Sequence, residues 1–253
     1  MRNLKLATGL ALVMGLVAAA PAAANILPVA QWDLNENSGT VAHTDNPLLS
    51  NNGTLQGGVT WTTGRFQSGL NFDGTDGEVY VPDSSALEGA NVTVSAWVNA
   101  GTSPGAYRYI VAKGASGCCT GSYGLYTGAN GGLEFYIGTS PGSYVVSPDA
   151  GTAVWNGAWH NVVGTFDGST VRVYVDGQQI GSGTPDTSPI QYGMPTSNDL
   201  AIGDYPWCSQ DLDFAGTIDE VKVFNRALGP AEINLAYQAS AHLPYASPFD
   251  LIL

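Results

Sequence analysis

Basic residues are scarce in this sequence. Lysine and arginine together number 8 among 253 residues, whereas aspartate and glutamate number 21, so the formal net charge is −13. A surface with this charge repels the phosphates of nucleic acids and the headgroups of anionic membranes, so we expect no nucleic-acid partner. Charged residues of both signs make up only 11% of the chain, which disfavours long helices rich in Glu and Lys.

Cysteine and histidine are also rare, with three residues of each. The sequence contains neither a Cys-x-x-Cys pair nor a His-Glu-x-x-His motif, and both absences argue against a zinc site. The cysteines are Cys118, Cys119 and Cys208. In an exported chain they would meet an oxidising compartment, and their odd number favours one disulfide and one spare thiol.

Long apolar runs are confined to the first residues. Two basic residues precede an apolar run at residues 6–20, and three alanines at 22–24 provide a small-residue cleavage site. This order is typical of a secretory signal peptide, so we expect residues 1–24 to be removed and the secreted chain to begin at Asn25. A membrane anchor is the alternative, but the run is short for a membrane span, and no later segment is long and apolar enough to be one. The mature chain would carry 6 basic and 21 acidic residues, a net charge of −15.

Glycine, in contrast, is abundant. The 33 glycines separate short stretches in which apolar and polar residues alternate. Such alternation is typical of strands that bury one face, joined by tight turns. The clearest pair lies at residues 159–166 and 171–175, with a turn at 167–169 between them. About a dozen strands of this kind predict a β-sandwich or a barrel.

A single segment has helical character. Pro230 suits a first helical turn, and residues 231–237 form one short amphipathic run. Residues 239–253 contain two prolines and no periodicity, so we expect a C-terminal tail there. No linker divides the remaining chain, which predicts one domain at residues 25–238.

Several short sequence blocks occur in the same order as in a known family of domains. They are WDLNENSG at 32–39, NGTL at 52–55, GLNFDG at 69–74, TVSAWV at 93–98, WHNV at 159–162, VYVDG at 173–177 and GTIDEV at 216–221. Together they resemble the laminin-G-like jelly-roll domains of the concanavalin A-like lectin/glucanase superfamily, which are also similar to pentraxins. The resemblance implies an all-β fold, an antiparallel two-sheet jelly-roll sandwich with one short C-terminal helix.

The motifs do not indicate an enzyme. Glucanases of the superfamily carry Glu-x-Asp-x-Glu on one strand, and this pattern is absent. Two similar heptapeptides at 101–107 and 138–144 each contain Gly-x-Ser-x-Gly, the spelling of a nucleophile elbow. Each serine is followed by proline, Pro104 or Pro141, which lacks the N–H that an oxyanion hole requires. We read both heptapeptides as turns that lead into strands. We predict a non-catalytic protein, with a polysaccharide-active enzyme as the lowest-ranked alternative.

One segment without strand alternation is the candidate ligand site. Between residues 204 and 213 it combines two aromatic residues with three carboxylates, namely Tyr205, Trp207, Asp204, Asp211 and Asp213. Aromatic faces stack on sugar rings and carboxylates accept hydrogen bonds from hydroxyls, so we predict a secreted binding module that recognises a glycan or another extracellular polymer. The alternative for this loop is a cystine-anchored structure with Trp207 packed on the rim of the sandwich.

A second class of function also stays open. The sandwich would then be a structural, self-associating protein of the cell surface or of a filament, with an extracellular protein as its partner. The apolar end of the chain at residues 249–253 would dock on a neighbouring copy, or would pack on its own domain. A buried Trp207 with apolar patches on opposite faces would favour this reading.

The resemblance also implies two structural features. Pentraxins place two loops on one face, and here these loops are residues 114–122 and 204–213, so a disulfide between Cys208 and Cys119 is preferred, with Cys118 as the alternative partner. Related sandwiches hold calcium between their opening and closing strands, which implies a calcium site with Asp219 as ligand and Asp45 as helper. Alternatively, Asp219 accepts hydrogen bonds from backbone amides.

Overall fold

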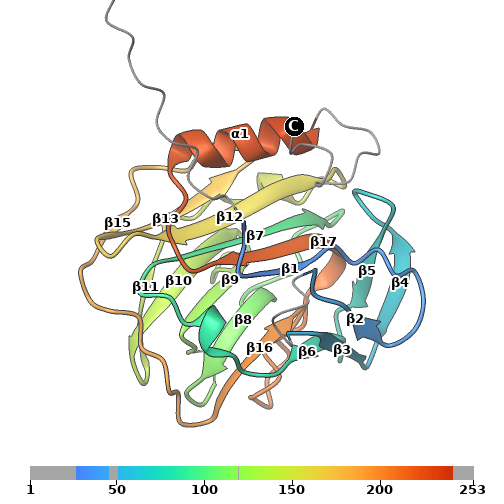
Figure 1. Ribbon diagram of the computed structural model, residues 1–253, viewed down its shortest axis with the longest axis horizontal. Coiled ribbons are helices and arrows are strands. Elements are labelled where there is room, and N and C mark those ends of the chain that lie inside the picture. Colours follow the sequence, from blue (N-terminus) through green and yellow to red (C-terminus); the bar gives the residue numbers. More distant parts are fainter. Residues whose placement is uncertain (1–26, 46–50, 119, 242–253) are drawn as a thin grey trace, which may run out of the picture.

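The computed structural model describes residues 27–45, 51–118 and 120–241. The predicted signal peptide and the residues at 249–253 lie outside this part of the chain. Strands form two antiparallel sheets with one helix at the C-terminal end, which confirms the predicted two-sheet sandwich (Figure 1). Among the described residues, no helix is long and apolar enough to cross a membrane.

The first sheet has nine strands. Its order is β14-β13-β12-β7-β17-β5-β4, with β1 added beside β17 and β15 beside β13. Its strands are β1 (Ala30–Trp32), β4 (Val59–Thr63), β5 (Ser68–Asp73), β7 (Val92–Asn99), β12 (His160–Phe166), β13 (Thr170–Val175), β14 (Gln178–Gln179), β15 (Thr184–Pro185) and β17 (Ala215–Phe224).

The second sheet has eight strands in the order β11-β10-β9-β8-β16-β6-β3-β2. Its strands are β2 (Val41–Ala42), β3 (Gly53–Gln56), β6 (Glu78–Val81), β8 (Tyr109–Ala115), β9 (Tyr123–Thr127), β10 (Leu133–Ser140), β11 (Ser143–Val146) and β16 (Ser197–Ile202). Two short 3-10 helices, Ser85–Leu87 and Thr152–Val154, lie in the connections.

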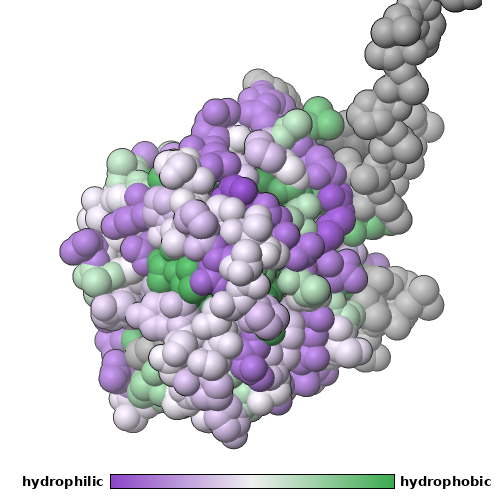
Figure 2. All heavy atoms as spheres, turned by 90° about the vertical axis from the view of Figure 1, so that its left-hand side faces the viewer, coloured by the Kyte–Doolittle hydropathy of each residue, from purple (hydrophilic) through white to green (hydrophobic). Residues whose placement is uncertain are grey.

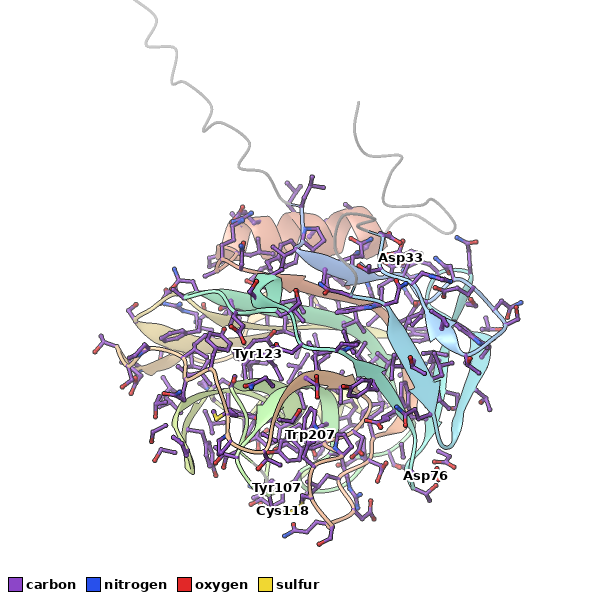
Figure 3. All side chains as sticks on the ribbon, turned by 60° about the horizontal axis from the view of Figure 1, so that its bottom comes forward. Asp33, Asp76, Tyr107, Cys118, Tyr123 and Trp207 are labelled. Atoms are coloured by element: carbon purple, nitrogen blue, oxygen red, sulfur yellow. A yellow bond between two sulfur atoms is a disulfide. The ribbon has the colours of Figure 1, made fainter. Side chains whose placement is uncertain are left out.

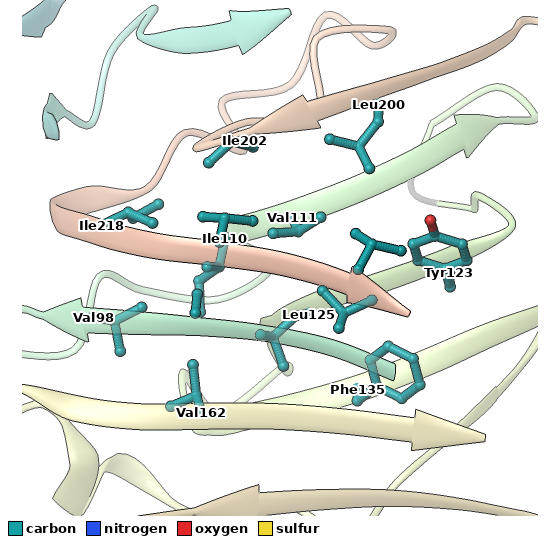
Figure 4. Close-up of a cluster of buried hydrophobic side chains, with 14 of the residues drawn as sticks. Val98, Ile110, Val111, Tyr123, Leu125, Phe135, Val162, Leu200, Ile202 and Ile218 are labelled. Atoms are coloured by element: carbon teal, nitrogen blue, oxygen red, sulfur yellow. The ribbon is translucent and has the colours of Figure 1, made fainter. Parts of the chain in front are cut away.

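The core lies between the two sheets. Alternate residues of facing strands meet there, and they are almost completely buried (Figure 4). Each such side chain stabilises the fold by about 1.5–3 kcal/mol relative to an exposed one. The inward residues that Figure 4 labels are Val98, Ile110, Val111, Tyr123, Leu125, Phe135, Val162, Leu200, Ile202 and Ile218.

The predicted hairpin of β12 and β13 shows how local sequence sets the turns. Asp167 accepts hydrogen bonds from the backbone N–H groups of Ser169 and Thr170, both at 2.9 Å, and pairs with Arg172. Gly168 adopts a φ of 83°, which residues with a Cβ avoid. These contacts hold the pKa of Asp167 at about 2, because its charged form is the one that is stabilised.

The C-terminal helix α1 (Pro230–Ala241) covers the outer face of the nine-stranded sheet (Figure 1). Leu228 and Ile233 pack there against Val163, Tyr174 and Phe224. The helix is longer than the predicted run at 231–237, and its last three residues lie in the segment that the sequence assigns to a tail. Because α1 sits on the nine-stranded sheet, the outer face of the eight-stranded sheet carries no helix in the described residues.

Candidate functional site

Two loops beside the eight-stranded sheet are joined covalently. Cys118 and Cys208, 90 residues apart in sequence, form a disulfide with their Cα atoms 4.9 Å apart. The preference for Cys119 is therefore wrong, and the alternative partner Cys118 is the bonded one. The physical reason is that a disulfide needs its two Cα atoms within about 7 Å, and Cys118 meets this condition with Cys208.

Tyr205 holds the same two loops together from the inside. Its side chain is fully buried, and its hydroxyl accepts a hydrogen bond from Thr120 N at 3.2 Å. The same hydroxyl lies 2.9 Å from the carbonyl oxygens of Gly117 and Thr120. This corrects the prediction that Tyr205 contacts a ligand, because a ring without exposed surface offers no face for stacking.

Trp207 matches part of each alternative that the sequence left open, a ligand-binding residue and a residue packed on the rim of the sandwich. Its ring packs edge-on against Tyr205, with centroids 5.3 Å apart, yet the residue stays partly exposed. Figure 3 shows Trp207 on the same side of the molecule as Tyr107 and Cys118, away from Asp33. Trp207 thus packs on the rim and still presents surface at one end of a larger aromatic array.

That array is a continuous row of six rings along the outer face of the eight-stranded sheet. Successive ring centroids lie 5.3, 4.9, 5.3, 5.2 and 5.8 Å apart. The row runs from the disulfide-linked loop across β8, β9, β10 and β11. Its members, in order, are Trp207, Tyr205, Tyr109, Tyr126, Tyr136 and Tyr144.

Strand alternation explains why these tyrosines face outward. Leu125 and Phe135 point into the core, so their neighbours Tyr126 and Tyr136 must point to the opposite face. Gly124 lies opposite Tyr136 in the ladder, and a Cβ there would come within 2.4 Å of the ring. The glycine therefore makes room for Tyr136 to lie flat across the neighbouring strand.

Five tyrosines line a hollow on this face, which we call the tyrosine groove: Tyr107, Tyr109, Tyr126, Tyr136 and Tyr144. Tyr109, Tyr126 and Tyr136 form its floor and are at most 5% exposed. Tyr107 and Tyr144 form its walls, with 40% and 49% of their surface exposed. The hollow itself measures only about 20 Å³, so a ligand would rest on the exposed rings of Tyr107 and Tyr144 while the buried floor keeps the shape of this surface.

Tyr107 has an unusual backbone. Its φ is 60°, in the left-handed region that bulky residues avoid, and such strain clusters at functional sites. Hydrogen bonds enforce this conformation: Tyr107 N donates to Thr127 O at 2.9 Å, and Arg108 N donates to the Thr127 hydroxyl at 2.8 Å. The Ser103 hydroxyl, which the sequence read as part of a turn, donates to Gly131 O at 2.8 Å and anchors the loop.

The sequence contains a signal for this groove that motif reasoning missed. The two similar heptapeptides at 101–107 and 138–144 each end in a tyrosine, and these are the wall residues Tyr107 and Tyr144. The first forms the turn before β8 and the second forms the turn between β10 and β11. Ser103 lies in the loop before β8 and Ser140 is the last residue of β10, and both heptapeptides end in an exposed tyrosine that lines the hollow.

Carboxylates surround the aromatic row. Glu134, on the same face as Tyr136, accepts a hydrogen bond from the Tyr126 hydroxyl at 3.0 Å, and burial raises its pKa. Burial also raises the pKa of the Tyr126 hydroxyl. Asp211 is exposed and pairs with Arg108, which follows the wall residue Tyr107 directly.

The other two predicted carboxylates lie deeper. Burial and the neighbouring Asp213 raise the pKa of Asp204 to about 7. Asp213 is 6% exposed, its Oδ1 atom has no hydrogen-bond partner, and burial followed by the charge of Asp211 raises its pKa. The loop at 204–213 therefore places one predicted carboxylate, Asp211, at the surface.

Asp219 and Asp45, the predicted calcium ligands, each make contacts within the protein. Asp219 is fully buried, and its two oxygens accept hydrogen bonds from Phe66 N at 2.9 Å and from Glu220 N at 2.8 Å. Asp45 instead neighbours Asp33 and accepts a hydrogen bond from Gln31. Within the described residues, no group of three or more Asp, Glu, His or Cys side chains is arranged to hold a metal ion. The contacts match the alternative reading of Asp219 as an acceptor for backbone amides, and calcium binding stays a prediction.

The sequence and fold together decide the family. A laminin-G-type model, described as the concanavalin A-like lectin/glucanases superfamily, matches residues 73–234. The chain belongs to this superfamily. The predicted resemblance is thereby confirmed over most of the domain. No curated protein matches the chain.

Solved structures with the same fold include proteins of several kinds. One is domain 4 of AbnA, a GH43 extracellular arabinanase from Geobacillus stearothermophilus, in complex with arabinotriose. It is 20% identical in sequence with a TM-score of 0.63, and the match covers 83% of this chain and 98% of that one. Trypanosoma rangeli sialidase with 2,3-difluorosialic acid is 19% identical with a TM-score of 0.61, covering 86% and 33%. The binding domain of botulinum neurotoxin DC with rat synaptotagmin II is 13% identical with a TM-score of 0.63, covering 85% and 52%.

These likenesses show the fold alone, because every identity is below 25%. The chain spans about a third of the sialidase and about half of the neurotoxin domain. They nevertheless correct one expectation. The prediction that the chain is not an enzyme is contradicted, since its fold recurs within a glycan-degrading arabinanase and a sialidase.

Proposed function

We propose that the chain binds a glycan in the tyrosine groove. The observation that carries the proposal is the pairing of Tyr107 and Tyr144 as exposed walls above a tyrosine floor. Aromatic rings with a polar tip bury apolar area while their hydroxyls stay hydrogen-bonded, a combination that suits the mixed surface of a sugar. The floor adds rigidity, because three mutually packed tyrosines lose little freedom when a ligand arrives.

The disulfide-linked loops support the same proposal. The bond between Cys118 and Cys208 and the buried hydroxyl of Tyr205 fix the loop that carries Trp207. A fixed loop pays little conformational entropy on binding, so Trp207 is suited to extend the groove at one end. The arabinanase domain of the same fold was solved with arabinotriose, which is consistent with glycan binding by such sandwiches.

We also propose that the protein works outside the cell. A disulfide persists in oxidising compartments, and laminin-G-like folds and the expected signal peptide at residues 1–24 agree with export.

A glycan array with purified variants tests the binding proposal. We expect the wild type to bind a defined set of glycans, and Tyr107→Ala and Tyr144→Ala each to weaken that binding at least tenfold. Leu235→Ala is the matched control, because Leu235 is 62% exposed on α1, which covers the opposite sheet. Retained affinity in both tyrosine variants, with unchanged circular dichroism, would refute a glycan site in the groove.

A further inference from the structure

We infer that the groove selects uncharged glycans and rejects glycans that carry carboxylate or sulfate groups. This inference rests on the proposed function and specifies the ligand class. The contacts of the few basic side chains are the first observation that supports this selectivity.

The described part of the chain contains six lysine and arginine residues, and each is already engaged. Five form ion pairs: Arg108 with Asp211, Lys113 with Asp83 and Glu88, Arg172 with Asp167, Lys222 with Glu220, and Arg226 with Glu232. The sixth, Arg65, lies 4.8 Å from the ring centroids of Phe66 and Trp97 and donates to the carbonyls of Ser240 and Ala241 at the end of α1. An anionic ligand would therefore find, among the described residues, no basic side chain that is not already engaged in an ion pair or a cation–π contact.

Arg108 is the basic residue next to the groove in sequence. It lies between Tyr107 in the wall and Tyr109 in the floor but does not itself line the hollow, and its side chain is 20% exposed. Asp211, whose side chain is 63% exposed, pairs with its guanidinium. The cation beside the groove is thus already matched by a carboxylate.

The remaining charges at the groove are negative. Glu134 contacts the hydroxyl of Tyr126 in the floor, and Asp149 lies close enough to raise the pKa of Glu134 further. A carboxylate accepts hydrogen bonds from sugar hydroxyls and cannot donate one to an anionic group while it is charged. A carboxylated or sulfated sugar would meet these like charges and lose its own hydration without compensation.

Figure 2 shows one flank of the molecule, with β11 and β15 toward the viewer, as mainly hydrophilic with small separate hydrophobic areas. A neutral glycan suits a mixed surface of this kind, because its hydroxyls replace water at polar groups while its ring faces cover apolar area.

The test compares matched glycans that differ only in charge. A bound neutral oligosaccharide is paired with its carboxylated counterpart, and galacturonan oligomers are paired with their methyl esters, at 10 mM and 1 M NaCl. We expect the charged member to bind at least tenfold more weakly at 10 mM salt. The difference should shrink at 1 M, where the Debye length falls to about 3 Å.

The substitution Asp211→Asn should increase binding of the carboxylated glycan. The change releases Arg108 beside Tyr107, so we expect the affinity for the carboxylated member to rise at least fivefold relative to the neutral member. Asp167→Asn is the control, because it releases Arg172 in the other sheet and should leave the ratio unchanged.

The two proposals fail in different ways. Equal affinity for both members at low salt, with binding still abolished by Tyr107→Ala, would overturn the charge selectivity and leave the glycan site standing. An absence of binding to any glycan would refute the proposed function itself, and the inference with it.

Discussion

Tyr107 and Tyr144 end two nearly identical heptapeptides and line one hollow on the eight-stranded sheet. Tyr107 does so with a backbone φ of 60°, whereas Tyr144 lies in the regular strand β11. The fold thus maintains a strained residue at an exposed position, where packing alone would not require it.

This strain leads to a test that separates stability from binding. We expect Tyr107→Gly to be more stable than Tyr107→Ala by about 1 kcal/mol, because glycine adopts a positive φ without a steric penalty. Both variants should lose glycan affinity alike, since both lack the ring. Urea unfolding measures the difference, and equal stability of the two would show that position 107 is not held in the left-handed region.

The groove floor depends on the absence of a side chain at Gly124. Gly124→Ala would bring a Cβ to 2.4 Å from the ring of Tyr136, so we expect a loss of about 1–3 kcal/mol in unfolding free energy and weaker glycan binding. Gly101→Ala is the control, because nothing lies within 4 Å of its Cβ position. If both substitutions prove neutral in thermal melts, Tyr136 is free to shift and the floor is not rigid.

Removal of the disulfide should affect both the fold and the site. The double variant Cys118→Ser with Cys208→Ser is expected to lose about 2–4 kcal/mol of stability, because the unfolded chain is no longer closed over 90 residues. Its glycan affinity should also fall as the loop with Trp207 loosens. Cys119→Ser should change neither property, and a large effect from this control would show that Cys119 takes part in the bond.

The raised carboxyl pKa values predict a pH dependence of stability. The pKa is raised from 3.8 to about 7 in Asp45 and Asp204 and to about 8 in Asp219. The folded state therefore holds these protons more tightly than the unfolded chain. Their contribution to stability is complete below about pH 4 and is lost as the pH rises through 7 to 8. We expect a higher melting temperature at pH 5 than at pH 8.

Two substitutions check the sign of this effect. Asp204→Asn should raise the melting temperature at pH 8 and change it little at pH 5, because the amide needs no proton. Asp167→Asn should do the opposite and destabilise at pH 7, since the pKa of Asp167 is lowered to about 2 and its charged form is the stabilising one. A melting temperature that rises from pH 5 to pH 8 in the wild type would contradict this account.

Export makes a simple prediction about the chain end. The basic start, the apolar run and the alanines at 22–24 predict a mature protein that begins at Asn25. N-terminal sequencing of protein recovered from the culture medium measures this directly. Secreted material that still begins at Met1 would rule out a cleaved signal peptide.

Local patterns predicted the strands and their turns well. The alternation at 159–166 and 171–175 became β12 and β13, and Asp167 and Gly168 formed the turn between them. Pro230 begins the helix as expected, although α1 continues to Ala241. Such features depend on neighbours within a few residues, so the sequence holds the information for them.

The site was harder to predict, because side-chain direction in loops depends on distant contacts. The aromatic and acidic composition at 204–213 drew attention to this rim, but it did not reveal that Tyr205 points inward to Gly117 and Thr120. The tyrosines of β9 and β10 were equally ambiguous, since a strand pattern tells which residues share a face and not whether that face is covered.

The sequence by itself therefore determined the family, the two-sheet architecture and the excess of negative charge. Composition gives the charge and short-range alternation gives the strands, whereas the family and the two-sheet architecture came from the resemblance of the short sequence blocks. Only the tertiary structure decided that Cys118 rather than Cys119 meets Cys208, that Tyr107 and Tyr144 face one hollow, and that Arg108 is neutralised by Asp211. Each of these relationships joins residues far apart in the chain, and their distance and direction are fixed only when the sheets have packed and the loops have closed over them.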